Sequence, residues 1–180
     1  TKFLYSNLGY VLLGQLIEAV SGEKYETYIT ENIFDKTGAE NRELNFNIEP
    51  MLNAKGYQKY WSLTNALLGL LIDKKKYMGS REGNWKSFKP CYINGTSYGG
   101  IIGSATGLVK YAQALLRNNS GLLDEAYKKI LFTECIIHNK PTGMSLSWFT
   151  GDLKDNKYYT HAGGGGGYYV ELRVYPALGV

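Results

Sequence analysis

Two short segments place groups suited to acyl-transfer chemistry near the two ends of this 180-residue sequence, and the first is Tyr5-Ser6-Asn7. A phenol stands two residues ahead of a carboxamide, directly before a periodic apolar segment that predicts a helix, so both side chains can project into one cleft. A phenol can relay a proton, and a carboxamide can hold a substrate amide or orient a catalytic side chain. Tyr92-Ile93-Asn94 has the same spacing, so on spacing alone a helix cap beside a buried aromatic residue is the preferred interpretation.

The second segment is His161-Ala162-Gly163-Gly164, at the expected end of a strand. A backbone without side chains can approach a bound ligand closely there, and one of its N–H groups can point at a developing oxyanion. The glycine run continues to Gly167, and consecutive glycines carry a high cost in chain entropy. That cost favours a steric requirement over the alternative, which is a flexible hairpin with an incidental histidine.

A third constellation competes with the first two. Gly95-Thr96-Ser97-Tyr98-Gly99 matches the nucleophile elbow G-x-S-x-G, and Asp152 and His161 follow in the Ser, Asp, His order of α/β-hydrolases. The elbow requires a strand before the serine and a helix directly after it. Here Gly99 to Gly103 intervenes without an alternating strand and helix pattern. A glycine-rich loop is the preferred interpretation, and an esterase that uses Ser97 is the alternative.

Apolar residues at three- and four-residue spacing predict helices through most of the first 140 residues. The first helix begins at Asn7, which we expect to be its N-cap, and ends at Ser21-Gly22. The second carries Tyr25 to Phe34 and stops before Thr37-Gly38, so the two helices should form an antiparallel pair. Three further helices are expected: one over Ser62 to Asp73, one capped by Ser104 that ends at Asn118-Asn119-Ser120-Gly121, and one over Leu123 to Glu134.

The pattern changes after Pro141, where alternating residues predict strands. Three consecutive strands are expected in an antiparallel meander, over Ser145 to Phe149, Lys157 to His161 and Tyr168 to Tyr175. By contrast, residues 43–59 and about thirty residues after Asp73 are rich in turn formers and predict irregular loops. Helices first and strands last indicate an α+β fold in a single incomplete domain, with residues 1–140 mainly helical and residues 141–180 forming strands of the core sheet.

The composition speaks against several classes of protein. The net charge of +4 comes from scattered basic residues apart from Lys74-Lys75-Lys76, which predicts a solvated helix end and no nucleic-acid partner. The two cysteines, Cys91 and Cys135, lack a CxxC pattern, so we expect unpaired thiols and no metal site. The longest apolar stretch, Ala66 to Ile72, is far below the about 20 residues of a membrane span. Sixteen tyrosines leave a saccharide- or peptide-binding module open as a non-enzymatic alternative.

Three collinear stretches resemble one known family. The Tyr-x-Asn segment and following helices of class C β-lactamases, DD-peptidases and related esterases are similar to FLYSNLGYVLLGQLIEAVSGEKYETYITENIF. The start of a later helix in those proteins resembles SYGGIIGSATGLVKYAQALL. Their core strands and Lys-Thr-Gly segment resemble SLSWF followed by YYTHAGGGGGYYVELRVYP, here in the His-x-Gly form of many esterase-like members. Nearly the whole chain takes part in the family's order, so the resemblance implies a partial β-lactamase/transpeptidase-like fold.

The resemblance also implies roles for individual residues. Tyr5 is expected to relay a proton, and Asn7 is expected to position the substrate. His161 takes the place of the lysine of Lys-Thr-Gly, the Gly164 N–H supplies half of an oxyanion hole, and the neighbouring Gly163 and Gly165 bind substrate. A neutral imidazole attracts carboxylates less well than an ammonium does, so the substrate stays open among amides, esters, peptides and lactams. No cofactor is implied, and the parent protein is expected outside the cytoplasm or in the cell envelope.

The nucleophile of that family is the serine of a Ser-x-x-Lys motif upstream of Tyr-x-Asn. This sequence has the pattern only at Ser21-Gly22-Glu23-Lys24, after Tyr5 and at the end of a helix, which indicates a coincidence. We therefore expect a fragment of a serine hydrolase that is inactive by itself, because its attacking residue lies elsewhere. Sheet edges exposed by missing strands predict self-association.

Overall fold

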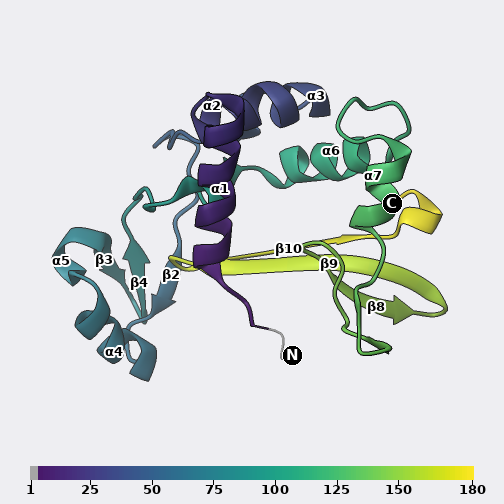
Figure 1. Cartoon of the computed structure of the whole chain (residues 1–180). Helices are drawn as coiled ribbons and strands as arrows, with labels where there is room; N and C mark the ends of the chain where they lie inside the picture. Colours follow the sequence, from purple (N-terminus) through teal and green to yellow (C-terminus); the bar gives the residue numbers. More distant parts are fainter. Residues whose placement is uncertain (1–3) are drawn as a thin grey trace. The chain divides into compact units, whose positions relative to one another are not determined.

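The computed structural model describes residues 4–180, and the chain divides into two compact units (Figure 1). The first unit comprises the chain up to Phe46 together with Asn94–His161 and Glu171–Val180. The second comprises Asn47–Ile93 and Ala162–Val170. Both units therefore combine segments that are far apart in the sequence. The prediction of a single incomplete domain stays a prediction.

Helix α1 (Asn7–Ser21) opens the first unit. Its N-cap is Ser6, whose Oγ accepts a hydrogen bond from the Gly9 N–H at 3.1 Å. The prediction that Asn7 caps this helix is wrong, because the extended backbone that a cap needs falls one residue earlier, at φ −142° in Ser6. Gly22 ends the helix as predicted, in the left-handed conformation at φ +77°.

The second predicted helix consists of three pieces. α2 (Tyr25–Ile29), a π-helical turn (Thr30–Phe34) and α3 (Asp35–Thr37) follow one another directly, and Gly38 ends the run at φ +74°. The run therefore includes Thr37, which the sequence pattern placed beyond its end. α6 (Ala105–Leu116) lies behind a Ser104 cap as predicted, and α7 (Glu125–Leu131) is shorter than predicted at both ends. Short elements complete this set: β1 (Leu44–Asn45), the 3-10 turn η2 (Thr96–Tyr98), β5 (Ile102–Gly103), β6 (Ile136–Ile137), β7 (Lys140–Pro141) and the 3-10 turn η3 (Pro176–Leu178).

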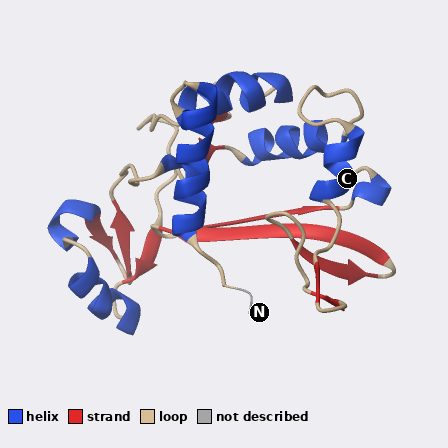
Figure 2. Cartoon of the chain, viewed as in Figure 1, coloured by secondary structure: helices blue, strands red, loops and turns tan. Residues whose placement is uncertain are grey.

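Three antiparallel strands form the larger sheet, in the order β10-β9-β8, which confirms the predicted meander (Figure 2). They are β8 (Phe149–Leu153), β9 (Asn156–Gly165) and β10 (Tyr168–Val174). The position predicted for the first strand, Ser145 to Phe149, is wrong because Ser147 has φ +65°, which an extended strand does not accommodate. The Ser145 N–H bonds the Trp148 carbonyl at 2.8 Å, so these residues form a tight turn before β8.

The core of the first unit lies between α6 and this sheet. Its buried members are Ala112, Leu115, Trp148, Tyr159 and Val174. The Phe132 ring packs against both Tyr159 and Trp148, at 4.9 Å and 6.3 Å between centroids. A helix face packed on an antiparallel sheet is an α+β arrangement, as the sequence pattern predicted.

The second unit contains a small sheet that the sequence pattern missed. Its order is β2-β4-β3, formed by β2 (Tyr57–Lys59), β4 (Trp85–Phe88) and β3 (Met78–Glu82). Figure 2 shows α4 (Leu63–Leu71) and α5 (Lys74–Tyr77) beside it. The strands are short and polar, so alternation is too brief to detect. Gly83-Asn84, with φ +61° at the glycine, joins β3 to β4, and a pair of this kind is typical of a hairpin turn.

Candidate active site

Tyr5 and His161, which come from opposite ends of the sequence, lie ring to ring in the first unit. Their centroids are 6.4 Å apart with the ring planes at 47°. The Ser6 cap fixes the chain just after Tyr5, and β9 carries His161 in the central strand of the sheet. Tyr5 is 52% exposed and His161 is partly buried, so solvent reaches the phenol. The structure therefore brings together two side chains to which the family resemblance assigned active-site roles.

Three further side chains surround this pair. The Tyr10 ring lies 6.2 Å from the Tyr5 ring, and the Phe149 ring lies 6.2 Å from the His161 ring. The Tyr10 hydroxyl donates to the Ser147 Oγ at 2.9 Å. We refer to these five residues as the Tyr5 cluster. Sequence reasoning missed Tyr10, Ser147 and Phe149, because their proximity depends on the packing of α1 against the segment before β8.

Ser147 holds the most unusual backbone conformation in the cluster. Its φ of +65° lies in the left-handed region, which costs a residue with a Cβ roughly 1–2 kcal/mol. Strained residues of this kind occur preferentially at functional sites, where surrounding structure enforces them. The strain here presents a hydroxyl to Tyr10, and so holds the second phenol of the cluster in place.

The structure distinguishes the two Tyr-x-Asn segments. Asn7 is exposed at the first position of α1, directly after the capped residue. Tyr92 instead accepts a hydrogen bond from the Ile48 N–H at 3.0 Å, so its hydroxyl fastens a loop within the second unit. Asn94 follows in an irregular segment. Only the first segment stands at the start of a helix, as the active-site interpretation requires.

Ser97 lies in the 3-10 turn η2 and not in a nucleophile elbow. The residues from Cys91 to Gly95 form no strand, and the strand β5 follows the turn where a helix would be required. A Cβ placed on Gly14 of α1 would come within 2.4 Å of the Ser97 Oγ, so this serine packs tightly against the helix. Asp152 is an exposed β8 residue opposite Lys157. The α/β-hydrolase interpretation is not supported.

Ser21 is part of a helix end. Its hydroxyl donates to the Ile17 carbonyl at 2.7 Å and accepts from the Glu23 N–H at 3.2 Å. Gly22 follows in the left-handed conformation. The Ser-x-x-Lys pattern at residues 21–24 thus has a structural explanation that needs no catalysis.

The end of the glycine run has a steric explanation within the second unit. Gly166 and Gly167 form the turn between β9 and β10, with φ of +57° and +81°. A Cβ on Gly167 would come within 2.2 Å of the Tyr57 nitrogen, and one on Gly56 within 1.9 Å of the Gly166 carbonyl oxygen. Side chains are excluded here by backbone packing alone.

The first part of the run is different. A Cβ on Gly163 or Gly165 would meet none of the described atoms within 4 Å, and one on Gly164 would approach the Tyr168 carbonyl oxygen at 3.3 Å. Packing among residues 4–180 therefore does not explain the absence of side chains at Gly163 and Gly165. Substrate binding by these two glycines, and oxyanion binding by the Gly164 N–H, stay predictions.

The lysine nearest to His161 along β9 is bound to a carboxylate. Lys157 Nζ lies 2.8 Å from Glu134, which also accepts a hydrogen bond from the Gly143 N–H at 2.8 Å. The hydrogen bond from Lys157, then the one from Gly143, hold the pKa of Glu134 below its ordinary value. The same bond to Glu134 raises the pKa of Lys157. Lys157 is thus a cation held in place, which disfavours it as a proton acceptor.

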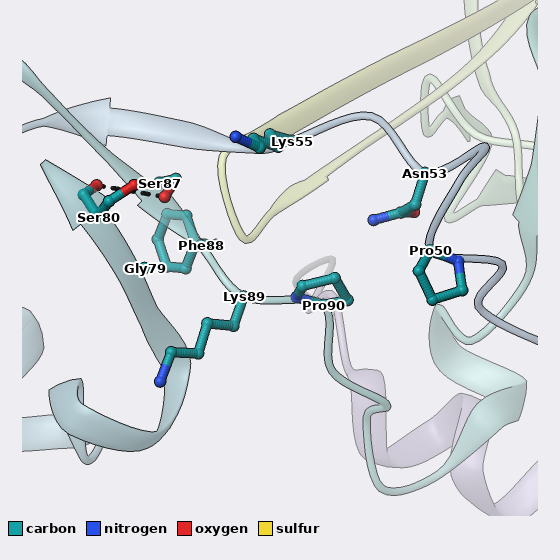
Figure 3. Close-up of a pocket in the computed structure, with 9 residues that line it drawn as sticks. All are labelled: Pro50, Asn53, Lys55, Gly79, Ser80, Ser87, Phe88, Lys89 and Pro90. Carbon is teal, nitrogen blue, oxygen red and sulfur yellow. Dashed lines mark hydrogen bonds between the residues drawn. The ribbon is translucent and has the colours of Figure 1, made fainter. Parts of the chain in front are cut away.

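Among residues 4–180, no group of three or more His, Cys, Asp or Glu side chains could hold a metal ion, and both cysteines are exposed thiols. None of the helices in that range combines the length and hydrophobicity needed to cross a bilayer. Figure 3 shows a pocket in the second unit, and no predicted site residue lines it. Its lining consists of Pro50, Asn53, Lys55, Gly79, Ser80, Ser87, Phe88, Lys89 and Pro90.

A family model described as Beta-lactamase matches residues 1–180. Among solved structures, the chain is similar to a penicillin-binding protein from Bacillus halodurans, at 23% identity and a TM-score of 0.70 over 98% of this chain and 49% of that one. It is also similar to an octameric penicillin-binding protein homologue from Pyrococcus abyssi, at 22% identity and a TM-score of 0.68 over 98% of this chain and 36% of that one. A class C β-lactamase has 16% identity and a TM-score of 0.62 over 98% of this chain and 50% of its own. A comparison with curated proteins finds no match.

At these identities the structural likeness shows the fold alone. It confirms the predicted α+β class and the partial β-lactamase/transpeptidase-like fold. The chain spans half or less of the length of each of the three structures. Because the family model covers the whole sequence, the chain belongs to the β-lactamase family of serine hydrolases.

Proposed function

We propose that this chain supplies the proton-relay and substrate-positioning residues of a serine hydrolase that acts through an acyl-enzyme on an amide, ester, peptide or lactam. The observation that supports the proposal is the ring contact between Tyr5 and His161, 6.4 Å between centroids. In the proposed reaction a serine oxygen attacks the substrate carbonyl carbon, and its proton passes through Tyr5 to the leaving group. Water then hydrolyses the ester between the acyl group and the serine, which releases the acid product and restores the serine hydroxyl.

His161 and Asn7 hold the substrate in this proposal. A neutral imidazole offers one N–H donor and one acceptor nitrogen, and a carboxamide offers donors and an acceptor. Such groups suit the polar edges of an amide or ester better than they suit a fixed carboxylate, which an ammonium would bind more strongly. The arrangement therefore favours substrates without a carboxylate at that position.

The attacking serine comes from polypeptide outside these 180 residues in this proposal. The hydroxyl of Ser21 is bonded to the Ile17 carbonyl, and Ser97 packs against Gly14. Both serines of the candidate motifs therefore have structural roles. We expect the 180-residue chain to show no turnover of a chromogenic ester or a cephalosporin. Hydrolysis that Ser97→Ala or Ser21→Ala abolishes would overturn this part of the proposal.

The decisive test uses a longer protein that includes the Ser-x-x-Lys segment which this proposal places upstream of the chain. In that protein Tyr5→Phe should lower kcat/KM by about 10²–10⁴ for the ester, because it removes the relay hydroxyl and keeps the ring. Tyr92→Phe is the matched control, since it makes the same change in the second Tyr-x-Asn segment, and it should leave kcat/KM within about twofold. Equal effects of the two substitutions would refute the role of Tyr5.

A further inference from the structure

Helix α4 in the second unit turns a polar residue inward and most of its leucines outward. Asn65 is the buried residue of the helix, at 8% exposure. Five large apolar side chains of this segment are exposed, between 49% and 82%, and we call them the α4 patch: Trp61, Leu63, Leu67, Leu70 and Leu71. The four leucines recur at the spacing of one helix face, and Asn65 lies on the opposite face. The hydrophobic face of this helix is thus its outer face.

Hydrogen bonds explain why the polar side faces inward. The Asn65 amide donates to the Tyr60 carbonyl at 2.6 Å and accepts from Gln58 at 2.8 Å. Its backbone N–H donates to the Ser62 cap at 3.0 Å, and the Lys74 ammonium donates to its carbonyl. A rotation of α4 that buried the leucines would break these bonds and leave polar groups unsatisfied. The fold of this unit therefore fixes the α4 patch toward its surface.

Positive charge is concentrated in the same unit. The second unit contains eight lysines and arginines and three acidic residues, so its net charge is +5. Because the whole chain has a net charge of +4, the first unit has a net charge of −1. Lys75 and Lys76 lie in α5, which begins at Lys74 shortly after α4 ends at Leu71, and both are exposed. The C-terminal end of the α4 patch is therefore followed closely along the chain by two ammonium groups and one exposed carboxylate, Asp73.

The other end of the α4 patch is also bordered by cations. Trp61 packs edge-on against Tyr60, at 5.1 Å between centroids. The guanidinium of Arg81 and the ammonium of Lys86 lie over the Tyr60 ring, at 4.2 Å and 6.0 Å from its centroid. An exposed tryptophan beside a tyrosine and basic side chains is typical of protein surfaces at the boundary between lipid and water.

We infer that the α4 patch and its flanking cations bind the surface of an anionic lipid bilayer. The leucines and Trp61 enter the boundary between headgroups and acyl chains, and the basic side chains meet lipid phosphates. An outward apolar stripe bordered by cations at both ends is complementary to that surface. A second copy of the chain fits less well, because two units with a net charge of +5 repel each other.

Co-sedimentation of the chain with vesicles tests this inference. The protein should bind vesicles that contain phosphatidylglycerol and bind pure phosphatidylcholine vesicles at least about tenfold more weakly, with binding lost at high salt. Lys75→Glu with Lys76→Glu should weaken binding by about 30-fold or more. Leu70→Ser with Leu71→Ser should weaken it by about tenfold or more. Both leucines are at least 80% exposed, so the fold should survive, which circular dichroism checks.

Leu12→Ser with Leu16→Ser is the matched control. These leucines of α1 are 57% and 56% exposed in the first unit, where the net charge is −1, so vesicle binding should not change. Three results would overturn the inference. They are no binding to anionic vesicles, equal loss in the α1 and α4 variants, or self-association in light scattering that the α4 variant abolishes while vesicles are not bound.

Discussion

Helices α1 and α4 resemble each other in sequence and differ in what they bury. Each begins at a serine cap, Ser6 or Ser62, and each exposes most of its leucines. The buried residue of α1 is Gly14, and the buried residue of α4 is Asn65. The first lets a neighbouring serine approach the helix backbone, and the second satisfies polar groups of its own unit through hydrogen bonds.

The difference shows that a hydrophobic stripe identifies a helix without identifying its inner face. On α1 the positions of Leu8, Leu12 and Leu16 match an amphipathic helix, yet all three are more than half exposed. In α1 the close packing of Ser97 against Gly14 determines which face points inward. In α4 the hydrogen bonds of Asn65 determine it. Three pairs of substitutions test this contrast.

Gly14→Ala should have the largest effect. The added Cβ would come within 2.4 Å of the Ser97 Oγ and 2.5 Å of its Cβ, so α1 and η2 must separate. We expect a loss of about 3 kcal/mol in the free energy of unfolding, measured by urea denaturation. Gly9→Ala in the same helix is the control, because its Cβ would meet Ser6 at an ordinary 3.7 Å. If both substitutions cost the same, close packing at Gly14 does not matter.

Asn65→Ala should cost less, about 2 kcal/mol, because it leaves the Tyr60 carbonyl and the Gln58 amide without their partner. Leu70→Ala on the outer face of the same helix should change stability by less than about 0.5 kcal/mol. Thermal melting followed by circular dichroism measures both. A larger loss for Leu70→Ala than for Asn65→Ala would reverse the assignment of inner and outer faces.

The serine caps should show the smallest and most similar effects. Ser6→Ala and Ser62→Ala each remove one acceptor, for the Gly9 N–H and the Asn65 N–H, and each should cost about 1 kcal/mol. Because the local bonds are alike, we expect the two losses to agree within about 0.5 kcal/mol in urea denaturation. Threonine at either position should restore most of the loss. A cap that contributes nothing would mean that packing alone determines where its helix starts.

The sequence predicted the larger elements of the fold and missed the smaller ones. Long periodic segments such as residues 7–21 and 105–116 became helices, because one stripe repeated over several turns is a strong signal. The Ser104 cap and the end at Gly22 were predicted, whereas the cap at Ser6 and the end at Leu116 were not. The sheet of the second unit was missed because β2 and β4 have three and four residues, too few for alternation to show. The strand placed at Ser145 was displaced because no side-chain pattern reveals the left-handed backbone at Ser147.

The residues of the candidate site were likewise predicted only in part. Tyr5 and His161 could be predicted because each belongs to a recognisable segment, and the structure brings their rings together. Phe149 could not be predicted, since its ring contact with His161 joins residues of two strands whose pairing register the sequence does not show. Sequence spacing carries no information about such a register until the turn between the strands is known.

The two hairpin turns of the larger sheet differ in how much alteration they would tolerate. The tip at Gly166 and Gly167 is pressed against the backbone of Gly56 and Tyr57, so it lacks the free space that makes hairpin tips convenient for labels or inserted peptides. The turn at Lys154 and Asp155 is exposed, with φ of +48° and +63°. A fluorophore, affinity tag or circularly permuted terminus therefore belongs at the second turn, where it would leave the glycine run intact.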